Sequence, residues 1–284
     1  MSIVNQIGIF SKLCVAVFVF VSGYGLAVST PKEIKLKDFY LHRFKKLYLN
    51  YWFIWLLFVP IGVFVFGRTF MDAYGEYAAI KAILDFFGLL NLTGMLGYNP
   101  TWWFYSCIFV LYLLFPLLNK QFDKSPYLIL VLSIFTVFIG FVPFIAPYSH
   151  YLLPFIAGML MAKRPELFRE IGAKECLLSL AILCLMRNFC GDLKFIVDTL
   201  MCVGLAMFLY RVPLAKRLSM VMESLGKHSM NIFLFHTFIF RYWFSDYIYI
   251  TRKPLLIFLS LLIPCWLISV ALEFSKEKLG FYKL

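Results

Sequence analysis

Long apolar segments alternate with short polar ones along almost the whole chain. About nine of them approach the length that crosses a bilayer, about 17 to 25 residues. They cover residues 7–28, 46–66, 101–118, 127–145, 149–163, 176–190, 193–210, 228–248 and 254–274. Since backbone polar groups in hydrocarbon must be satisfied within the segment, the pattern predicts an all-α, polytopic transmembrane bundle of about nine helices, forming one domain over residues 1–284. The sixth and seventh segments are the weakest, because Arg187, Asp192 and Lys194 interrupt or flank them.

The composition agrees with a membrane protein. Hydrophobic residues make up 62% of the chain and the mean hydropathy is +0.84, whereas soluble domains are roughly 45–50% apolar. The seven cysteines form no CxxC pair and no metal-ligand spacing, so we interpret them as small core residues and predict no metal site.

The charge distribution predicts an orientation. Most of the 27 Lys and Arg residues fall in one set of alternate loops, which places those loops and the C-terminus in the cytoplasm. The same bias accounts for most of the net charge of +12 and attracts anionic lipid head groups, so no nucleic-acid partner is predicted. With nine spans the N-terminus would begin outside. We therefore expect either one more helix upstream of this sequence or an error in one of the two weak segments.

The loop over residues 67–100 falls on the outer side in this orientation. Lys81 and Asp85 are four residues apart, and the residues around them supply an apolar face. This pattern predicts an amphipathic helix over residues 73–90 that lies flat in the membrane interface. We interpret it as an anchor, and a lid over an outward-facing acceptor site is the alternative.

The densest group of cations lies between the first two apolar segments, on the predicted cytoplasmic face. It consists of Lys32, Lys35, Lys37, Arg43, Lys45 and Lys46, with His42 among them. Such a group fixes the topology of a membrane protein. It also suits an anionic substrate, because cations bind phosphates through charge-assisted hydrogen bonds.

Three phrases carry a resemblance to a known family. They are FVFVSGYGL at 18–26, followed by Phe39, Tyr40 and RFKK at 43–46; TWWFY at 101–105, running to YLLFPLL at 112–118; and LGKHSMNIFLFH at 225–236. In this order they resemble the acyltransferase-3 family, the integral membrane O-acyltransferases of bacterial surface glycans. The resemblance covers essentially the whole sequence.

The sequence departs from the family pattern in two places. The family carries a histidine in a helix upstream of the SGF-like phrase, and the residues before Ser22 hold no counterpart, so the family's first helix is expected to be missing from this sequence. The family's R-x-x-R motif reads R-x-x-K at Arg43 and Lys46, which keeps the charge and loses one bidentate fork.

The resemblance implies transfer of a short acyl group, most simply acetyl, from cytoplasmic acyl-CoA to hydroxyls of a cell-surface or exported polysaccharide. Acyl-CoA would be the donor substrate, with no permanently bound cofactor, and the surface glycan would be the acceptor. The protein would lie in the bilayer of the bacterial cytoplasmic membrane. We predict that Arg43, Lys45 and Lys46 bind acyl-CoA, and that Lys32, Lys35 and Lys37 only fix the topology.

No residue is assigned to catalysis from the sequence. A hydroxyl acceptor calls for a base, usually histidine. His236 lies deep in a predicted helix, and Ser229 shares its face. We predict that these two residues, Asp198 and Ser22 line the site. Pairing with a partner is the alternative for Asp198, because ionisable groups inside membranes are usually paired.

The small residues of the first phrase have a structural interpretation as well. Ser22, Gly23 and Gly25 would let neighbouring helices approach closely, as small residues do in membranes.

Another class of function stays open. The chain could be a catalytically inactive or truncated relative, or a non-enzymatic membrane protein of polysaccharide export or transport. A transporter predicts paired broken helices and charged sites at the midplane. The sequence offers only Lys12, Asp198 and His236 for such sites, so the enzyme interpretation is favoured.

Overall fold

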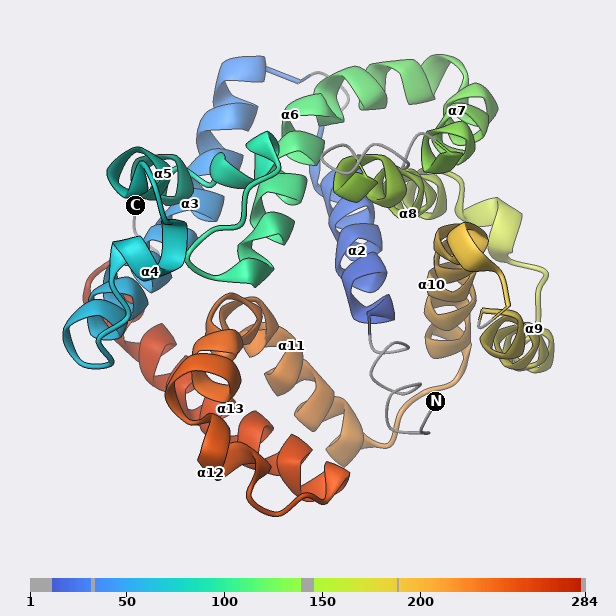
Figure 1. The fold of residues 1–284 in the computed structure, drawn as a ribbon. Coiled ribbons are helices and arrows are strands. Elements are labelled where there is room, and N and C mark those ends of the chain that lie inside the picture. Colours follow the sequence, from blue (N-terminus) through green and yellow to red (C-terminus); the bar gives the residue numbers. More distant parts are fainter. Residues whose placement is uncertain (1–11, 32–33, 139–145, 188, 282–284) are drawn as a thin grey trace. The chain divides into compact units, whose positions relative to one another are not determined.

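The computed structural model describes residues 12–31, 34–138, 146–187 and 189–281 (Figure 1). Within these ranges the regular structure is helical and no strand is present, so the all-α prediction is confirmed. Three helical segments of the described chain are long and apolar enough to cross a membrane: Leu36–Phe64, Pro100–Lys124 and Pro254–Lys278. The larger count of about nine spans stays a prediction. Lys32, which the sequence analysis assigned to topology, lies outside the described residues.

The chain divides into two compact units. Unit 1 comprises residues 1–40 and 107–214, and unit 2 comprises residues 41–106 and 215–284. The division falls inside two helices, α3 (Leu36–Phe64) and α6 (Trp103–Lys124). Each unit is therefore built from stretches that are distant in the sequence.

Unit 1 is organised around the contact between α2 (Leu13–Ser29) and α8 (Ala146–Lys163) (Figure 1). A Cβ atom on Gly23 would lie 2.1 Å from the backbone oxygen of Phe155, and one on Gly158 would lie 2.1 Å from that of Phe20. The two backbones thus touch where glycine removes the side chain. The predicted close approach is confirmed for Gly23 and is wrong for Gly25, which has open space around it.

Unit 1 also contains the first residues of α3, the second part of α6, α7 (Pro126–Phe138), α9 (Ala173–Met186) and α10 (Lys194–Arg211). Two short helical turns, η4 (Pro165–Phe168) and η5 (Gly191–Leu193), belong to it as well. Predicted segments 149–163, 176–190 and 193–210 correspond to α8, α9 and α10 within a few residues. Their apolar composition was therefore a sound guide to helical structure.

Unit 2 contains most of α3 and the C-terminal helices (Figure 1). Its other elements are α4 (Phe70–Tyr74), α5 (Ala78–Phe86), η1 (Leu90–Thr93), η2 (Pro100–Trp102), α11 (Lys216–Thr237), the π-helical turn η6 (Phe238–Trp243), α12 (Ser245–Tyr249) and α13 (Pro254–Lys278). Bulky aromatic side chains fill its core, among them Tyr51, Trp102 and Phe235, each at most 1% exposed.

The apolar segment 228–248 is not one regular helix. Helix α11 ends at Thr237, and the π-helical turn follows it. At this junction the Phe238 N–H bonds to the carbonyls of Phe235 and His236. The Leu234 carbonyl instead accepts hydrogen bonds from Trp102 Nε1 at 2.9 Å and Asn99 Nδ2 at 3.0 Å. Two of the three phrases, TWWFY and LGKHSMNIFLFH, are thereby joined.

The prediction of a single helix over residues 73–90 is wrong. The structure has α4 and α5, separated where Gly75 and Tyr77 take the positive φ values 63° and 59°. Lys81 does not pair with Asp85, because its ammonium donates to the Tyr74 carbonyl at 2.8 Å. The Asp85 side chain is fully buried, and the Tyr51 hydroxyl of α3 donates to the Asp85 carbonyl at 2.6 Å. This segment is therefore packed against α3.

Candidate active site

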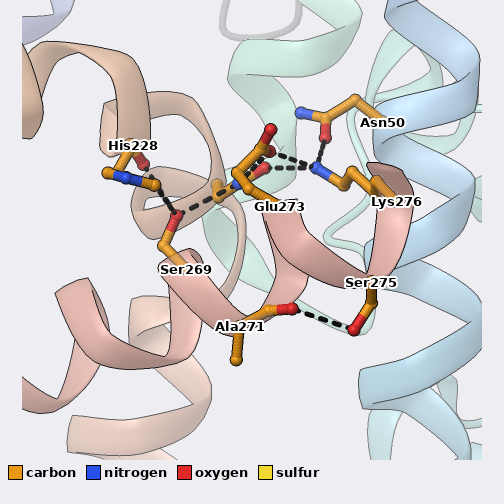
Figure 2. A network of polar contacts seen from close by, with 8 residues as sticks. Asn50, His228, Ser269, Ala271, Glu273, Ser275 and Lys276 are labelled. Atoms are coloured by element: carbon orange, nitrogen blue, oxygen red, sulfur yellow. Dashed lines mark hydrogen bonds and ion pairs between the residues drawn. The ribbon is translucent and has the colours of Figure 1, made fainter. Parts of the chain in front are cut away.

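A polar network inside unit 2 joins three helices (Figure 2). We call it the α11–α13 network, and its members are Asn50 of α3, His228 and Asn231 of α11, and Ser269, Glu273 and Lys276 of α13. The α13 residues are four and three positions apart, a spacing that puts side chains on one face of a helix. Apolar composition places α13 in the membrane, so this polar face needs partners within the protein.

Lys276 is the most densely bonded member of the network. Its side chain is 4% exposed, and its ammonium donates to Asn50 Oδ1, to Asn231 Oδ1 at 2.8 Å and to Glu273 Oε1 at 2.9 Å. An ammonium group has three N–H donors, so these acceptors use all of them. A buried lysine is tolerated only with such partners.

Asn231 connects the Lys276 ammonium group to the part of the network that contains His228. Its Nδ2 donates to Glu273 Oε1 at 2.6 Å and to Ser269 Oγ at 3.1 Å. Ser269 Oγ lies 3.0 Å from His228 Nδ1 and 3.5 Å from the His228 carbonyl, so the shorter separation favours Nδ1 as its partner. The His228 ring is buried and meets Trp266 edge-on, with the ring centroids 6.2 Å apart. A titratable ring is thus linked to a buried ion pair through an amide and a hydroxyl.

The predicted acyl-CoA residues lie on the helix that supplies Asn50. Helix α3 begins at Leu36, so Arg43, Lys45 and Lys46 are helical and are not part of a loop. Arg43, Lys46 and Asn50 are three and four positions apart and share one face of α3. Arg43 is half-buried, and Lys45 and Lys46 are exposed. The basic face therefore leads along α3 to the α11–α13 network.

The predicted site-lining residues do not fall in one unit. Ser22 and Asp198 belong to unit 1, and Ser229 and His236 belong to unit 2. The Ser22 hydroxyl donates to the Phe18 carbonyl at 2.8 Å, and that of Ser229 donates to the Gly226 carbonyl at 2.7 Å. Both are bonds within the residue's own helix.

His236 has a defined proton position. Its Nδ1 lies 3.0 Å from the carbonyl oxygens of both Ile232 and Phe233, and carbonyls only accept hydrogen bonds. Nδ1 therefore carries the proton in the neutral ring, which leaves the lone pair on Nε2. The ring is half-buried and stacks on Phe240 with the centroids 5.6 Å apart.

Asp198 is one half of a buried ion pair in unit 1. Its carboxylate accepts from Nε of Arg187 and, at 3.1 Å, from the NH2 nitrogen of that guanidinium. Arg187 is 6% exposed and Asp198 is 5% exposed. This bidentate geometry agrees with the second interpretation of Asp198 in the sequence analysis, in which it pairs with a charged partner.

A further buried acid lies in the 67–100 segment. Asp85 Oδ2 accepts from the Tyr74 hydroxyl at 2.6 Å and from the Tyr98 N–H at 2.8 Å. Burial raises the pKa of Asp85 to about 6, although these hydrogen bonds and the charge of Arg68 lower it. The charge of the Asp85 carboxyl group therefore responds to mildly acidic pH.

Sequence reasoning missed most of the α11–α13 network. Lys276 lies just beyond the predicted segment 254–274 and was not considered as a site residue, although it is 3% exposed in α13, and Glu273 within that segment was overlooked. A signal was available, because Ser269, Glu273 and Lys276 mark one face of an otherwise apolar helix. Asn50 offered no comparable signal, since its partner is more than two hundred residues away.

The chain matches a protein-family model over most of its length. The acyltransferase-3 model, described as an acyltransferase domain, matches residues 1–274. No curated protein and no solved structure matches significantly.

Proposed function

Because the chain belongs to the acyltransferase-3 family and is in general terms a membrane acyltransferase, we propose that it moves a short acyl group from acyl-CoA to a polysaccharide hydroxyl. The group is most simply acetyl, and the acceptor is a cell-surface or exported glycan. The proposed location is the bacterial cytoplasmic membrane, with the C-terminus in the cytoplasm. The lysine and arginine bias of the loops supports that orientation.

One observation carries the proposal beyond the family match. The hydrogen bonds from Lys276 to Asn50 and Asn231 connect the helix that carries Arg43 and Lys46 with the helix that carries the LGKHSMNIFLFH phrase. The helix that carries the basic residues suited to coenzyme A phosphates and the helix that carries the histidine-bearing phrase are thus joined within unit 2 by the α11–α13 network.

The proposed chemistry assigns separate tasks to the helix that carries the basic residues and to the helix that carries the histidine-bearing phrase. Arg43, Lys45 and Lys46 hold the phosphates of the donor by charge-assisted hydrogen bonds. A base then takes the proton from the acceptor hydroxyl, whose oxygen attacks the thioester carbonyl, and the coenzyme A thiolate leaves. His236 suits the acceptor side, because its proton is on Nδ1 and its Nε2 can accept another.

Replacing Arg43 by Ala in the full chain tests the proposal. Loss of a hydrogen-bonded charge contact should reduce transfer of labelled acetyl from acetyl-CoA to the glycan by about 10- to 100-fold. Transfer is measured in membrane vesicles, with the amount of inserted protein determined in parallel. Lys37→Ala is the matched control, because Lys37 is exposed on the same helix and is assigned only to topology. Normal transfer by Arg43→Ala would contradict donor binding at this segment.

A further inference from the structure

The charges of the α11–α13 network fix the orientation of the Asn231 amide. The Lys276 ammonium has only donors, so the Asn231 atom that lies 2.8 Å from it must be the carbonyl oxygen Oδ1. The other end of the amide lies 2.6 Å from Glu273 Oε1, and an ionised carboxylate only accepts hydrogen bonds. The NH2 group of Asn231 therefore points to Glu273 and, at 3.1 Å, to Ser269 Oγ.

This orientation determines where the hydroxyl hydrogen of Ser269 goes. A hydroxyl has one hydrogen to donate, and Ser269 Oγ already accepts from Asn231 Nδ2. Two acceptors lie near that hydrogen, both on His228 (Figure 2): the ring nitrogen Nδ1 at 3.0 Å and the backbone carbonyl oxygen at 3.5 Å. The second separation is too long for a good O–H···O bond. The hydrogen therefore goes to Nδ1, and the neutral His228 ring carries its own proton on Nε2.

The Nε2–H group of His228 is a donor that the fold leaves unused. It makes no hydrogen bond to a described residue, and Nε2 is not among the described polar atoms that are sealed from solvent without a partner. The ring itself is held in place by Trp266, whose Nε1 donates to Ser224 Oγ at 3.1 Å. His236 has the opposite tautomer, with its lone pair on Nε2. One histidine of the LGKHSMNIFLFH phrase thus offers a donor, and the other offers an acceptor.

The same network reaches the helix to which donor binding is assigned. Lys276 donates to Asn50 Oδ1. Asn50 shares one face of α3 with Arg43 and Lys46, the residues proposed to hold the phosphates of the donor. On the basis of the proposed function, we propose that His228 is a catalytic residue, whose Nε2–H donates to the carbonyl oxygen of the acyl donor's thioester.

A donor at this oxygen assists the step in which negative charge develops there. The acceptor hydroxyl oxygen forms a bond to the thioester carbon, and one electron pair of the C=O bond moves to the carbonyl oxygen. A preorganised N–H stabilises that charge, and a neutral imidazole can supply it. The C=O bond re-forms as the C–S bond breaks and the coenzyme A thiolate leaves, while the hydroxyl proton goes to the base. Lys276, Asn231 and Ser269 are positioning residues, because they act through the tautomer of His228.

Nitrogen-15 NMR of the histidine rings tests the tautomer in the full chain in detergent. The chain has four histidines, and His228→Gln assigns the signals of His228. At mildly alkaline pH, at which an ordinary imidazole is neutral, Nε2 should carry the proton and Nδ1 should not. A proton on Nδ1 in the wild type would overturn the proposal.

Asn231→Asp should move this proton. A carboxylate has no donor, so the Ser269 hydroxyl turns its hydrogen to the new carboxylate, and Nδ1 must gain a proton to bond the serine oxygen. Ser275→Ala is the matched control on the same helix, because the Ser275 hydroxyl donates to the Ala271 carbonyl at 2.8 Å (Figure 2). It should leave the spectrum of His228 unchanged. An unprotonated Nδ1 in Asn231→Asp would contradict the positioning role of Asn231.

Two substitutions of His228 separate the donor role from a structural one. Glutamine places an amide N–H near the position of Nε2, whereas asparagine reaches only the position of Nδ1, which contacts Ser269. His228→Asn should lower kcat for acetyl transfer about 100-fold, the cost of one lost transition-state donor, with KM for acetyl-CoA little changed. His228→Gln should keep kcat within about tenfold of the wild type. Membrane vesicles with matched amounts of inserted protein provide the measurement.

The remaining outcomes are distinct. Higher transfer by His228→Asn than by His228→Gln would show that the Ser269 contact matters rather than the donor, and equal transfer by the two variants would also overturn the catalytic role. A wild type that transfers no acetyl would contradict the proposed function and the catalytic role of His228 together. The NMR spectra would still decide the tautomer in that case.

Discussion

The two units bury their ion pairs in different ways. In unit 1, Arg187 and Asp198 face each other in a two-pronged contact, and both carboxylate oxygens are used. In unit 2, Lys276 and Glu273 share their bonds with the amide of Asn231, and the chain of contacts continues to a histidine. The first arrangement joins two charged groups directly, while the second extends through an amide and a hydroxyl toward a titratable group. We therefore interpret the first as structural and the second as the framework of the site.

Replacing the acid of each ion pair by its amide should give the largest difference between the two units in the free energy of unfolding. Asp198→Asn leaves the buried Arg187 guanidinium without its carboxylate, and we expect the free energy of unfolding to fall by about 3–5 kcal/mol. Glu273→Gln should cost about half as much, because Lys276 keeps two amide acceptors and Glu273 is 19% exposed. Equilibrium unfolding in detergent, followed by circular dichroism, measures both values. Equal losses would remove the distinction between the two pairs.

Asp85 is a buried acid of unit 2 for which the described residues show no ion pair, and its pKa makes the stability of the protein depend on pH. Its pKa is raised to about 6, so the folded state binds a proton more tightly than the unfolded state. Stability should therefore fall as pH rises from about 4 to about 6 and then level off, by at most about 3 kcal/mol. Asp85→Asn should lose this component.

Melting temperatures of the wild type and Asp85→Asn across that pH range provide the measurement. The difference between the two curves isolates Asp85 from the other acids. Parallel curves would show that Asp85 does not carry a raised pKa.

The glycine contact of unit 1 should give a smaller effect. Gly23→Ala forces α2 and α8 apart, because the new Cβ would meet the Phe155 backbone, and overpacking typically costs about 1–3 kcal/mol. Gly25→Ala is the matched control in the same helix. It should be neutral or stabilising by up to about 1 kcal/mol, since alanine favours the helix and the position is open. The same unfolding experiment applies, and similar losses in both variants would contradict the contact.

The sequence predicted the features that depend on local composition. Apolar length predicted helices, and the small residues of the SGYG phrase predicted a close helix approach, which the structure shows between α2 and α8 at Gly23. The prediction of one helix over residues 73–90 failed, although the spacing of the apolar residues is helical. Gly75 and Tyr77 adopt positive φ values, which the periodicity of the sequence does not reveal.

The site could be predicted only in part. Arg43 and Lys46 were proposed as donor-binding residues because a short motif marks them, and their shared face follows from helix geometry. Asn50 and Lys276 could not be paired, because the contact joins α3 and α13, whose contacting residues are more than two hundred positions apart. Asp198 was identified as an ionisable residue in an apolar segment, but its partner Arg187 had been noted only as an interruption. Long-range pairing is set by packing, which a single sequence does not contain.

The most direct test of the account compares two double variants that remove both charges of each pair. Lys276→Met with Glu273→Gln, and Arg187→Met with Asp198→Asn, leave no uncompensated charge, so each should fold better than the variant that removes only the acid. The measurement is acetyl transfer from acetyl-CoA to the glycan per inserted molecule. The account predicts that transfer is lost in the unit 2 double variant and kept in the unit 1 double variant. Kept transfer in the first, or lost transfer in a well-folded second, would contradict it.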